Sequence, residues 1–379
     1  MIYILIVSCV PYLLSLFLCE FSSLSAVAII IFSLTPLILP WSVLRKTSNQ
    51  WKVYRKTLPK CLNWLIRLGV LSALINIGLC ASAGGFDITS ANVFQSVSEA
   101  GSFNAVKRYL DGTEPSNSFL MMLTFNALIL SSVYGKVLKS IALVICLGVY
   151  TILTLAKWPL YVAISIMASG YISTSPSCGF FIQVCRPKNK FQKAKAFFYV
   201  IIITIVITVV LSLAIFLRTD MQTFELSEIA ENVKSYSLNQ YCNYSYWYEK
   251  IYNPSAAPNF QSYFAGPVSL LGGVRIQGIY EQTITMNESD SNIFTVSRGL
   301  IEAFTLLGPL IFSSLAAILI TFLRMRNMLK ILVIILNMTL ISCFLGINVS
   351  IFKDNSVWVS VITSAIILIR FPPLLSSTK

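Results

Sequence analysis

The chain contains no histidine, and this absence limits the chemistry open to it. A histidine general base and a histidine metal ligand are both excluded. The nine cysteines include no Cys-x-x-Cys pair, so the usual spacing of a zinc site is missing as well. We therefore expect no bound metal and no cofactor. Any catalysis would depend on carboxylates, cations and aromatic side chains.

Charged residues are also scarce. They make up 11% of the chain, whereas a soluble domain carries about a quarter. Hydrophobic residues make up 56%, and the mean hydropathy is +0.76. This composition predicts an all-α polytopic membrane protein. The net charge of +13 does not indicate nucleic-acid binding, because no basic, aromatic-rich soluble domain is present. Orientation in the membrane and contact with anionic lipid explain it better.

About ten apolar segments are long enough to cross a bilayer, which takes about twenty residues per helix. They are 1–18, 24–43, 62–82, 117–134, 138–155, 159–184, 196–217, 299–323, 330–350 and 356–374. We interpret the first as a retained helix, because it has no basic residues before it and no clear cleavage site. The sequence thus divides into a bundle of about seven helices (1–217), a long polar loop (218–298) and a bundle of about three (299–379).

The distribution of charge predicts which side of the membrane this loop faces. With ten spans and the 44–61 loop inside, 19 of the 28 basic residues fall on one side, which identifies it as the cytoplasmic side. All 15 acidic residues fall on the other side. Both termini are then cytoplasmic and the long loop lies outside. Cys242 is the one cysteine in that loop, so the loop has no internal disulfide. We place the other cysteines, Cys19 among them, in or beside apolar spans.

The long loop carries a cluster of aromatic residues: Tyr241, Tyr244, Tyr246, Trp247, Tyr248 and Tyr252. Aromatic rings stack on sugar rings, and tyrosine hydroxyls bond to sugar hydroxyls. We therefore take Tyr246 and Trp247 as candidate substrate-binding residues. The alternative is an interfacial belt, in which tyrosine and tryptophan are common.

Cations on the outer side could bind a phosphate group. Arg275 follows two glycines inside the loop and is the first candidate for a catalytic cation. Lys157, Arg218 and Arg298 lie at the outer ends of spans. The alternative for these cations is snorkelling to lipid headgroups or local pairing. In particular, Arg298 and Glu302 are four residues apart on one helix face and are placed to form an ion pair.

The run Tyr263-Phe264-Ala265-Gly266-Pro267 lies late in the loop. Its Gly266-Pro267 pair breaks a helix, and the apolar stretch 263–273 predicts a re-entrant element lining a cavity. This run, the long outer loop and the basic inner loops resemble the Wzy-type O-antigen polymerases, which polymerise oligosaccharide repeat units. Lys157 stands where that family usually has an arginine at the outer end of a span. The family's pattern of arginine, ten residues and glycine is not found here.

The resemblance implies a metal-independent glycosyltransferase of lipopolysaccharide biosynthesis in the bacterial inner membrane. It would polymerise undecaprenyl-diphosphate-linked repeat units, as donor and acceptor, at the periplasmic face, with a chain-length regulator as a further partner. For this reaction we expect catalytic roles for Arg275, Arg298 and Glu302. We expect substrate contacts from Lys157, Arg218, Tyr263, Gly266, Pro267, Tyr246 and Trp247.

Two other classes of protein are weighed against this interpretation. A flippase for lipid-linked oligosaccharides, or another transporter, would have short loops and ionisable residues inside its spans, whereas this chain has few mid-span charges. Another lipid-linked transferase, such as an O-antigen ligase, typically uses a periplasmic histidine, and this chain has none.

Overall fold

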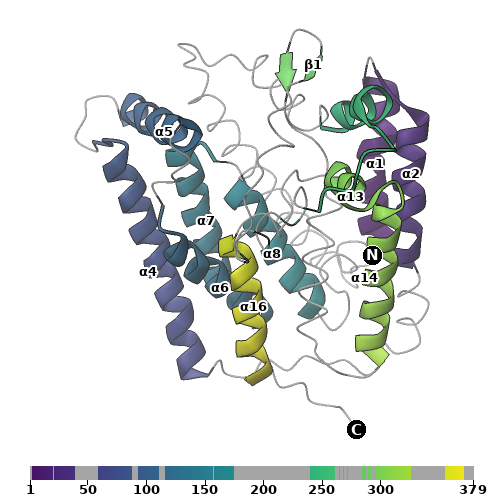
Figure 1. Ribbon diagram of the computed structural model, residues 1–379. Coiled ribbons are helices and arrows are strands. Elements are labelled where there is room, and N and C mark those ends of the chain that lie inside the picture. The colour runs from purple at the N-terminus through teal and green to yellow at the C-terminus, as the bar shows by residue number, and fades with distance from the viewer. Residues whose placement is uncertain are drawn as a thin grey trace, which may run out of the picture. The chain divides into compact units, whose positions relative to one another are not determined.

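The computed structural model describes residues 2–19, 21–38, 59–87, 93–110, 116–156, 158–174, 240–260, 264, 268, 271, 284–286, 289–291, 296–325 and 355–370. These residues are predominantly helical (Figure 1). The chain forms two compact units. The first consists of Met1–Asn49 with Lys234–Trp358, and the second of Gln50–Val233 with Val359–Lys379. These units are defined by contacts within the folded chain, whereas the predicted division separates membrane helices (1–217 and 299–379) from a polar loop (218–298). The predicted division is not tested by the two units and stays a prediction.

The second unit is a helix bundle. Its helices are α4 (Lys60–Ala83), α5 (Val93–Leu110), α6 (Ser118–Val133), α7 (Val137–Thr154), α8 (Trp158–Thr174) and α16 (Asn355–Arg370), the last of which begins at the end of the first unit. Asn117 caps α6 by accepting hydrogen bonds from the backbone of Phe119 and Leu120 at 2.9 and 3.2 Å. A short turn through Gly135, at φ +65°, follows α6, so α6 and α7 lie antiparallel.

The helices of this bundle pack through small and polar residues. Asn126 of α6 accepts hydrogen bonds from the hydroxyls of Thr363 and Ser364 of α16, at 2.8 and 2.6 Å. Ser131 of α6 bonds Ser140 of α7 at 2.8 Å. The outward side of α4 is apolar instead, and the exposed residues are Trp64, Leu68, Leu71, Leu74, Ile75 and Leu79. Polar contacts inside and apolar side chains outside are typical of membrane helices.

Gly69 permits a close approach between α4 and α6. A Cβ atom added there would lie 2.1 Å from the Cβ of Ala127 and 2.8 Å from the carbonyl oxygen of Leu123, both in α6. We expect Gly69→Ala to destabilise the protein by about 1–3 kcal/mol, because α4 and α6 must separate. Gly78→Ala is the matched control, since a Cβ there meets nothing within 4 Å. Thermal unfolding in detergent measures both, and equal midpoints would contradict this packing.

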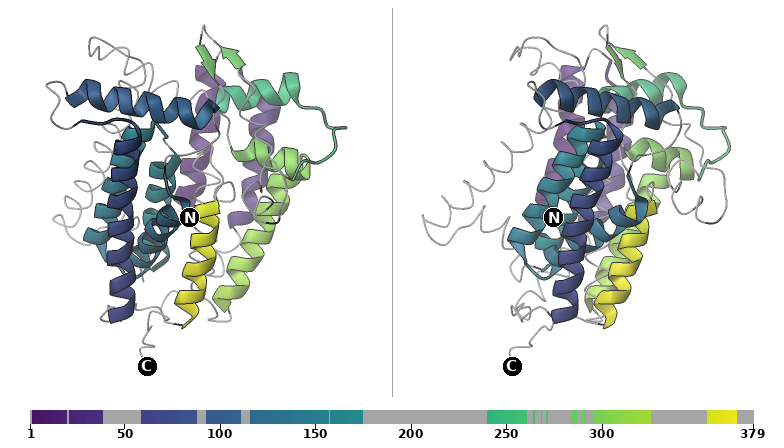
Figure 2. Two further views of the ribbon diagram at one scale, coloured as in Figure 1. Left: turned by 60° about the vertical axis from the view of Figure 1, so that its left-hand side comes forward. Right: turned by 90° about the vertical axis from the view of Figure 1, so that its left-hand side faces the viewer.

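Helix α5 lies crosswise over one end of α4 and α7 (Figure 2). Asn104 of α5 donates hydrogen bonds to the carbonyl oxygens of Cys80 in α4 and Leu153 in α7, at 2.9 and 2.8 Å. Gly84 lies so close to Ala100 that an added Cβ would be 2.7 Å from its Cα. The segment between the expected spans 62–82 and 117–134 therefore contains a helix of its own, which the apolar pattern alone did not indicate.

The first unit is built on two neighbouring helices, α1 (Ile2–Leu18) and α2 (Leu24–Leu34), followed by the 3₁₀ turn η1 (Thr35–Ile38). Ser23 caps α2 by accepting a hydrogen bond from the backbone of Ala26 at 3.1 Å. Helix α14 (Gly308–Met325) packs against α2 and η1, and the hydroxyl of Ser313 donates to the carbonyl oxygen of Ser33. A small antiparallel hairpin, β1 (Ile284–Met286) with β2 (Ser289–Ser291), lies in the polar loop.

Helix α13 (Val296–Phe304) and α14 are bent by 100° relative to each other, which differs from the continuous helix expected over 299–323. Thr305, at φ 65°, ends α13 in the left-handed region, where a β-branched residue is rare. Gly308 accepts the close approach of Leu300, whose carbonyl oxygen would lie 2.2 Å from an added Cβ. Pro309 follows in the first turn of α14, where its missing N–H is not needed. The break places the short helix α13 across the start of α14.

Most expected spans correspond to helices where the structure describes them. Among the described residues, α4 and α7 are long and apolar enough to cross a membrane, and the bent pair α13–α14 would be a third such span. Shorter apolar helices lie at four other expected spans, as α2, α6, α8 and α16. The spans 196–217 and 330–350 lie outside the described residues. The total of ten spans is therefore still a prediction.

Candidate functional site

The aromatic cluster of the long loop is built into the first unit. Residues 240–246 are helical and continue into the π-helical turn η3 (Trp247–Ile251). π-Turns are frequent at functional sites. Tyr241, Tyr244 and Trp247 are buried, whereas Tyr246, Tyr248 and Tyr252 are half-buried. The three buried rings pack in a core with residues of α1, α2 and α13. They therefore form neither of the two predicted surfaces, a stacking surface for sugars or an interfacial belt.

Tyr12 of α1 joins this cluster to two other elements. Its ring meets Tyr241 and Tyr244 edge-on, with centroids 4.6 and 5.9 Å apart. Its hydroxyl lies 2.9 Å from the hydroxyl of Ser297 in α13. The hydroxyl of Tyr244 donates to the carbonyl oxygen of Ala26 at 3.5 Å, and burial raises the pKa of Tyr244 well above its ordinary value. Tyr244 therefore stays protonated near neutral pH.

Arg298 of α13 is buried against the cluster. Within the parts of the chain that the structure describes, it is the one charged residue with a buried side chain, and 3% of it is exposed. Its Nε donates to Oε1 of Glu302 at 2.8 Å, which confirms the pairing expected from their spacing. Its guanidinium carbon lies 5.1 Å from the ring centroid of Trp247. A carboxylate and an aromatic face thus both compensate the buried charge.

Glu302 faces the surface more than its partner does. Its side chain is 20% exposed, so solvent reaches it. The loop that follows the aromatic turn runs over this helix, because the backbone N–H of Asn259 donates to the carbonyl oxygen of Glu302 at 2.7 Å. Phe260 and Phe264 pack edge-on against Phe304, at 5.2 and 6.0 Å between centroids. The exposed carboxylate therefore lies where the polar loop covers the helix break.

A row of aromatic rings connects the buried arginine to the surface. Trp247, under Arg298, lies 5.2 Å from Tyr252, and Tyr252 stacks on Tyr248 at 5.8 Å with ring planes 12° apart. Because 2% of Trp247 is exposed, its ring is not offered to a ligand. The half-buried rings of Tyr248 and Tyr252 are offered instead. Tyr248 and Tyr252 belong to the predicted aromatic cluster, but Tyr246 and Trp247 are the candidates chosen from the sequence for substrate binding.

The structure brings together three of the predicted site residues: Trp247, Arg298 and Glu302. Tyr246 is half-buried on the other side of the turn, edge-on to Phe21 at 5.4 Å. The remaining predicted site residues lie outside the described part of the chain, and they are Lys157, Arg218, Tyr263, Gly266, Pro267 and Arg275. Among the described residues, no group of three histidine, cysteine or acidic side chains could hold a metal ion.

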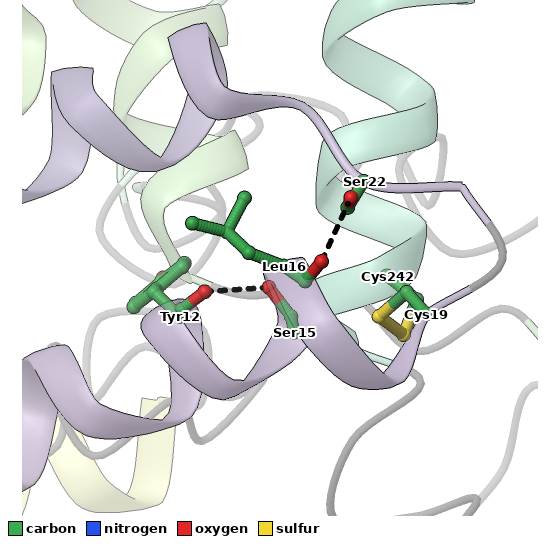
Figure 3. The surroundings of a disulfide bond; sticks show 6 residues. All are labelled: Tyr12, Ser15, Leu16, Cys19, Ser22 and Cys242. Atoms are coloured by element: carbon green, nitrogen blue, oxygen red, sulfur yellow. Dashed lines mark hydrogen bonds between the residues drawn. A yellow bond between two sulfur atoms is a disulfide. The ribbon is translucent and has the colours of Figure 1, made fainter.

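A disulfide fastens this turn to the end of α1. Cys19 and Cys242 are bonded, with 5.7 Å between their Cα atoms and 223 residues between them in sequence (Figure 3). Cys19 lies just beyond α1, beside the first expected span as predicted, and its partner belongs to the long loop. The bond between them was not predicted. The sequence had no spacing signal for this bond, because disulfide pairing between distant residues is set by the fold.

Comparison with known proteins does not assign the chain to a family. No family model, no curated protein and no solved structure matches the chain. The function must therefore be argued from the site itself.

Proposed function

We propose that this protein is a membrane glycosyltransferase of the O-antigen polymerase type. It transfers a growing glycan from its undecaprenyl diphosphate carrier to a lipid-linked repeat unit at the periplasmic face of the inner membrane. The observation that carries the proposal is the Arg298–Glu302 pair, which lies at a helix break and is covered by an aromatic segment of the polar loop. A buried arginine, a partly exposed carboxylate and aromatic rings together suit a polar sugar substrate.

The disulfide supports the placement of the loop outside the cytoplasm. Disulfides form and persist in oxidising compartments, such as the bacterial periplasm, and are rare in the cytosol. Cys19 follows the first expected span, and Cys242 belongs to the 218–298 loop. The charge distribution assigns both segments to the outer side by an independent argument. The two arguments agree on the same topology.

The proposed reaction replaces one bond to a sugar carbon by another. The acceptor hydroxyl oxygen attacks the anomeric carbon of the donor, the bond from that carbon to the diphosphate oxygen breaks, and the diphosphate leaves as an anion. Glu302 takes the proton of the acceptor hydroxyl as general base. Arg298 does not reach substrate, because it is buried, and it holds the carboxylate of Glu302 in place instead. Tyr248 and Tyr252 present their rings to the sugars.

The leaving diphosphate requires positive charge. Arg275, Arg218 and Lys157 are the residues that we propose for it, and they lie outside the described part of the chain. No step in this reaction needs a metal, because the diphosphate is already a good leaving group and cations can stabilise it as it departs.

Deletion of the gene tests the proposal. We expect the deletion strain to make lipopolysaccharide with a single repeat unit, and the wild-type gene to restore the ladder of longer chains. Loss of O-antigen altogether would indicate a flippase, because no repeat unit would reach the periplasm. A normal ladder in the deletion strain would overturn the proposal.

A further inference from the structure

The turn between α1 and α2 holds the aromatic segment from one side, and we call this set of contacts the clasp. Its covalent part is the Cys19–Cys242 disulfide, which joins the residue after α1 to the residue that follows Tyr241 (Figure 3). Near the bond, the hydroxyls of Ser15 and Ser22 donate to the carbonyl oxygens of Tyr12 and Leu16, at 2.7 and 3.3 Å. These bonds secure the end of α1 where the disulfide is attached.

The non-covalent part of the clasp continues along the next two turns of the cluster. Phe21 meets Tyr246 edge-on at 5.4 Å, and Nζ of Lys250 lies 5.5 Å from the ring centroid of Phe21. The hydroxyls of Ser23 and Ser25 both donate to Oε1 of Glu249, the latter at 2.6 Å. These hydrogen bonds lower the pKa of the Glu249 carboxyl, so it is ionised near neutral pH.

The clasp fixes the residues that present the sugar-binding rings. Tyr248 lies between two held residues, Trp247 under Arg298 and Glu249 under the α2 cap. Glu249 and Lys250 are exposed, so water competes for their contacts with Ser23, Ser25 and Phe21. Water does not compete for the disulfide, because it is a covalent bond. The disulfide also joins residues 223 positions apart, so it restricts the unfolded chain as well.

We propose that the Cys19–Cys242 disulfide is a positioning element of the saccharide site, which keeps Tyr248 and Tyr252 in the orientation that binds the lipid-linked oligosaccharide. The identity of this ligand rests on the proposed function. The bond forms when the two thiols lose two protons and two electrons to a disulfide oxidant of the periplasm. Reduction returns them and leaves the aromatic turn held by its exposed contacts alone.

Counting thiols tests the bond without any activity. The denatured protein is treated with a polyethylene-glycol maleimide before and after reduction. We expect the wild type to gain two adducts on reduction and the C19A/C242A variant to gain none. The control variant C61A/C146A removes two free cysteines and should gain two, as the wild type does. No gain in the wild type would overturn the inference and leave the proposed function standing.

Kinetics separate positioning from general stabilisation. Purified protein is assayed with an undecaprenyl-diphosphate-linked repeat unit as donor and acceptor. We expect C19A/C242A, and the reduced wild type, to show a KM about three- to tenfold higher with little change in kcat, the range for one lost aromatic contact. Reoxidation should restore the wild type but not the variant. A fall in kcat at constant KM would indicate fewer folded molecules and would overturn the positioning role.

Limited proteolysis keeps the two proposals distinguishable. The exposed residues 253–260 follow the clasped turn, and we expect reduction to increase their cleavage in the wild type but not in C19A/C242A. Unchanged cleavage would overturn the clasp whatever the activity. If the wild type bears the disulfide but does not polymerise, the proposed function fails. The lipid-linked oligosaccharide is then no longer the ligand assigned to Tyr248 and Tyr252. The cleavage result still decides whether the disulfide positions the aromatic turn.

Discussion

Replacing Glu302 with glutamine is expected to abolish chain extension even in the molecules that fold and reach the membrane. Glutamine keeps the volume of the side chain and an oxygen that accepts the hydrogen bond from Nε of Arg298, which is 2.8 Å long. It cannot accept the proton of a sugar hydroxyl. Loss of a general base lowers a rate by roughly 10²–10⁴-fold. The measurement is the length of O-antigen on lipopolysaccharide, normalised to the amount of protein in the membrane.

Arg298→Ala is the matched variant, and it should act mainly through stability. It would remove the charge that pairs with Glu302 and the guanidinium that covers Trp247. Removal of one partner from a buried ion pair costs about 3–5 kcal/mol, and the partial exposure of Glu302 places this case at the lower end. Arg298→Lys keeps the charge but not the flat stacking surface, so an intermediate loss is expected.

The two variants therefore differ in what they change. E302Q should lower the unfolding midpoint in detergent, because the buried charge of Arg298 loses its carboxylate partner and keeps only a hydrogen bond. R298A should lower the midpoint further, because it also removes the guanidinium that covers Trp247. A normal ladder from E302Q at normal abundance would remove Glu302 from the mechanism. An unchanged midpoint for R298A would contradict the buried contacts of Arg298.

The sequence predicted the ends of three apolar helices closely, whereas α2 ends at Leu34, well before the expected residue 43. The ends expected at residues 18, 82 and 134 agree within one residue with α1, α4 and α6. These ends coincide with strong local signals: a polar run after Leu18, glycines after Ala83, and Gly135 before Lys136. Helix ends of this kind are determined by local chemistry, so the sequence is enough to place them.

The break between α13 and α14 was missed, although a signal was present. Gly308-Pro309 repeats the glycine-proline pair that we interpreted as a helix breaker at residues 266–267. At 308–309 it lies inside an apolar run, and hydropathy alone does not separate one helix from two. The left-handed conformation of Thr305 stores about 1–3 kcal/mol of strain, which only the surrounding packing can offset. That packing is tertiary and cannot be predicted from local sequence.

The sequence predicted the local contacts of the site but not the contacts between residues that are far apart in the chain. The pairing of Arg298 with Glu302 follows from their spacing on a helix, and it is confirmed. The contact of Arg298 with Trp247 joins residues far apart in sequence, as does the disulfide between Cys19 and Cys242. Composition identified the aromatic cluster but could not separate its buried rings from its exposed ones, because this depends on which helices pack against it.

That separation predicts opposite outcomes for two adjacent residues. Trp247→Ala should destabilise the protein by about 3–5 kcal/mol, because the ring is buried and lies between Arg298 and Tyr252. Little folded protein should reach the membrane, and the ladder should be lost with it. Trp247→Phe retains an aromatic face under the guanidinium, so it should recover much of the abundance.

Tyr248→Ala should show the reverse pattern. This ring is half-buried and stacks on Tyr252 at the surface, so its loss should change the unfolding midpoint little. If the stacked pair holds sugar, the KM for the lipid-linked repeat unit should rise by about three- to tenfold at normal abundance. An unchanged KM would remove the pair from the saccharide site. An unfolding midpoint of Y248A as low as that of W247A would mean that Tyr248 belongs to the core with Trp247. The saccharide-binding surface would then have to lie elsewhere.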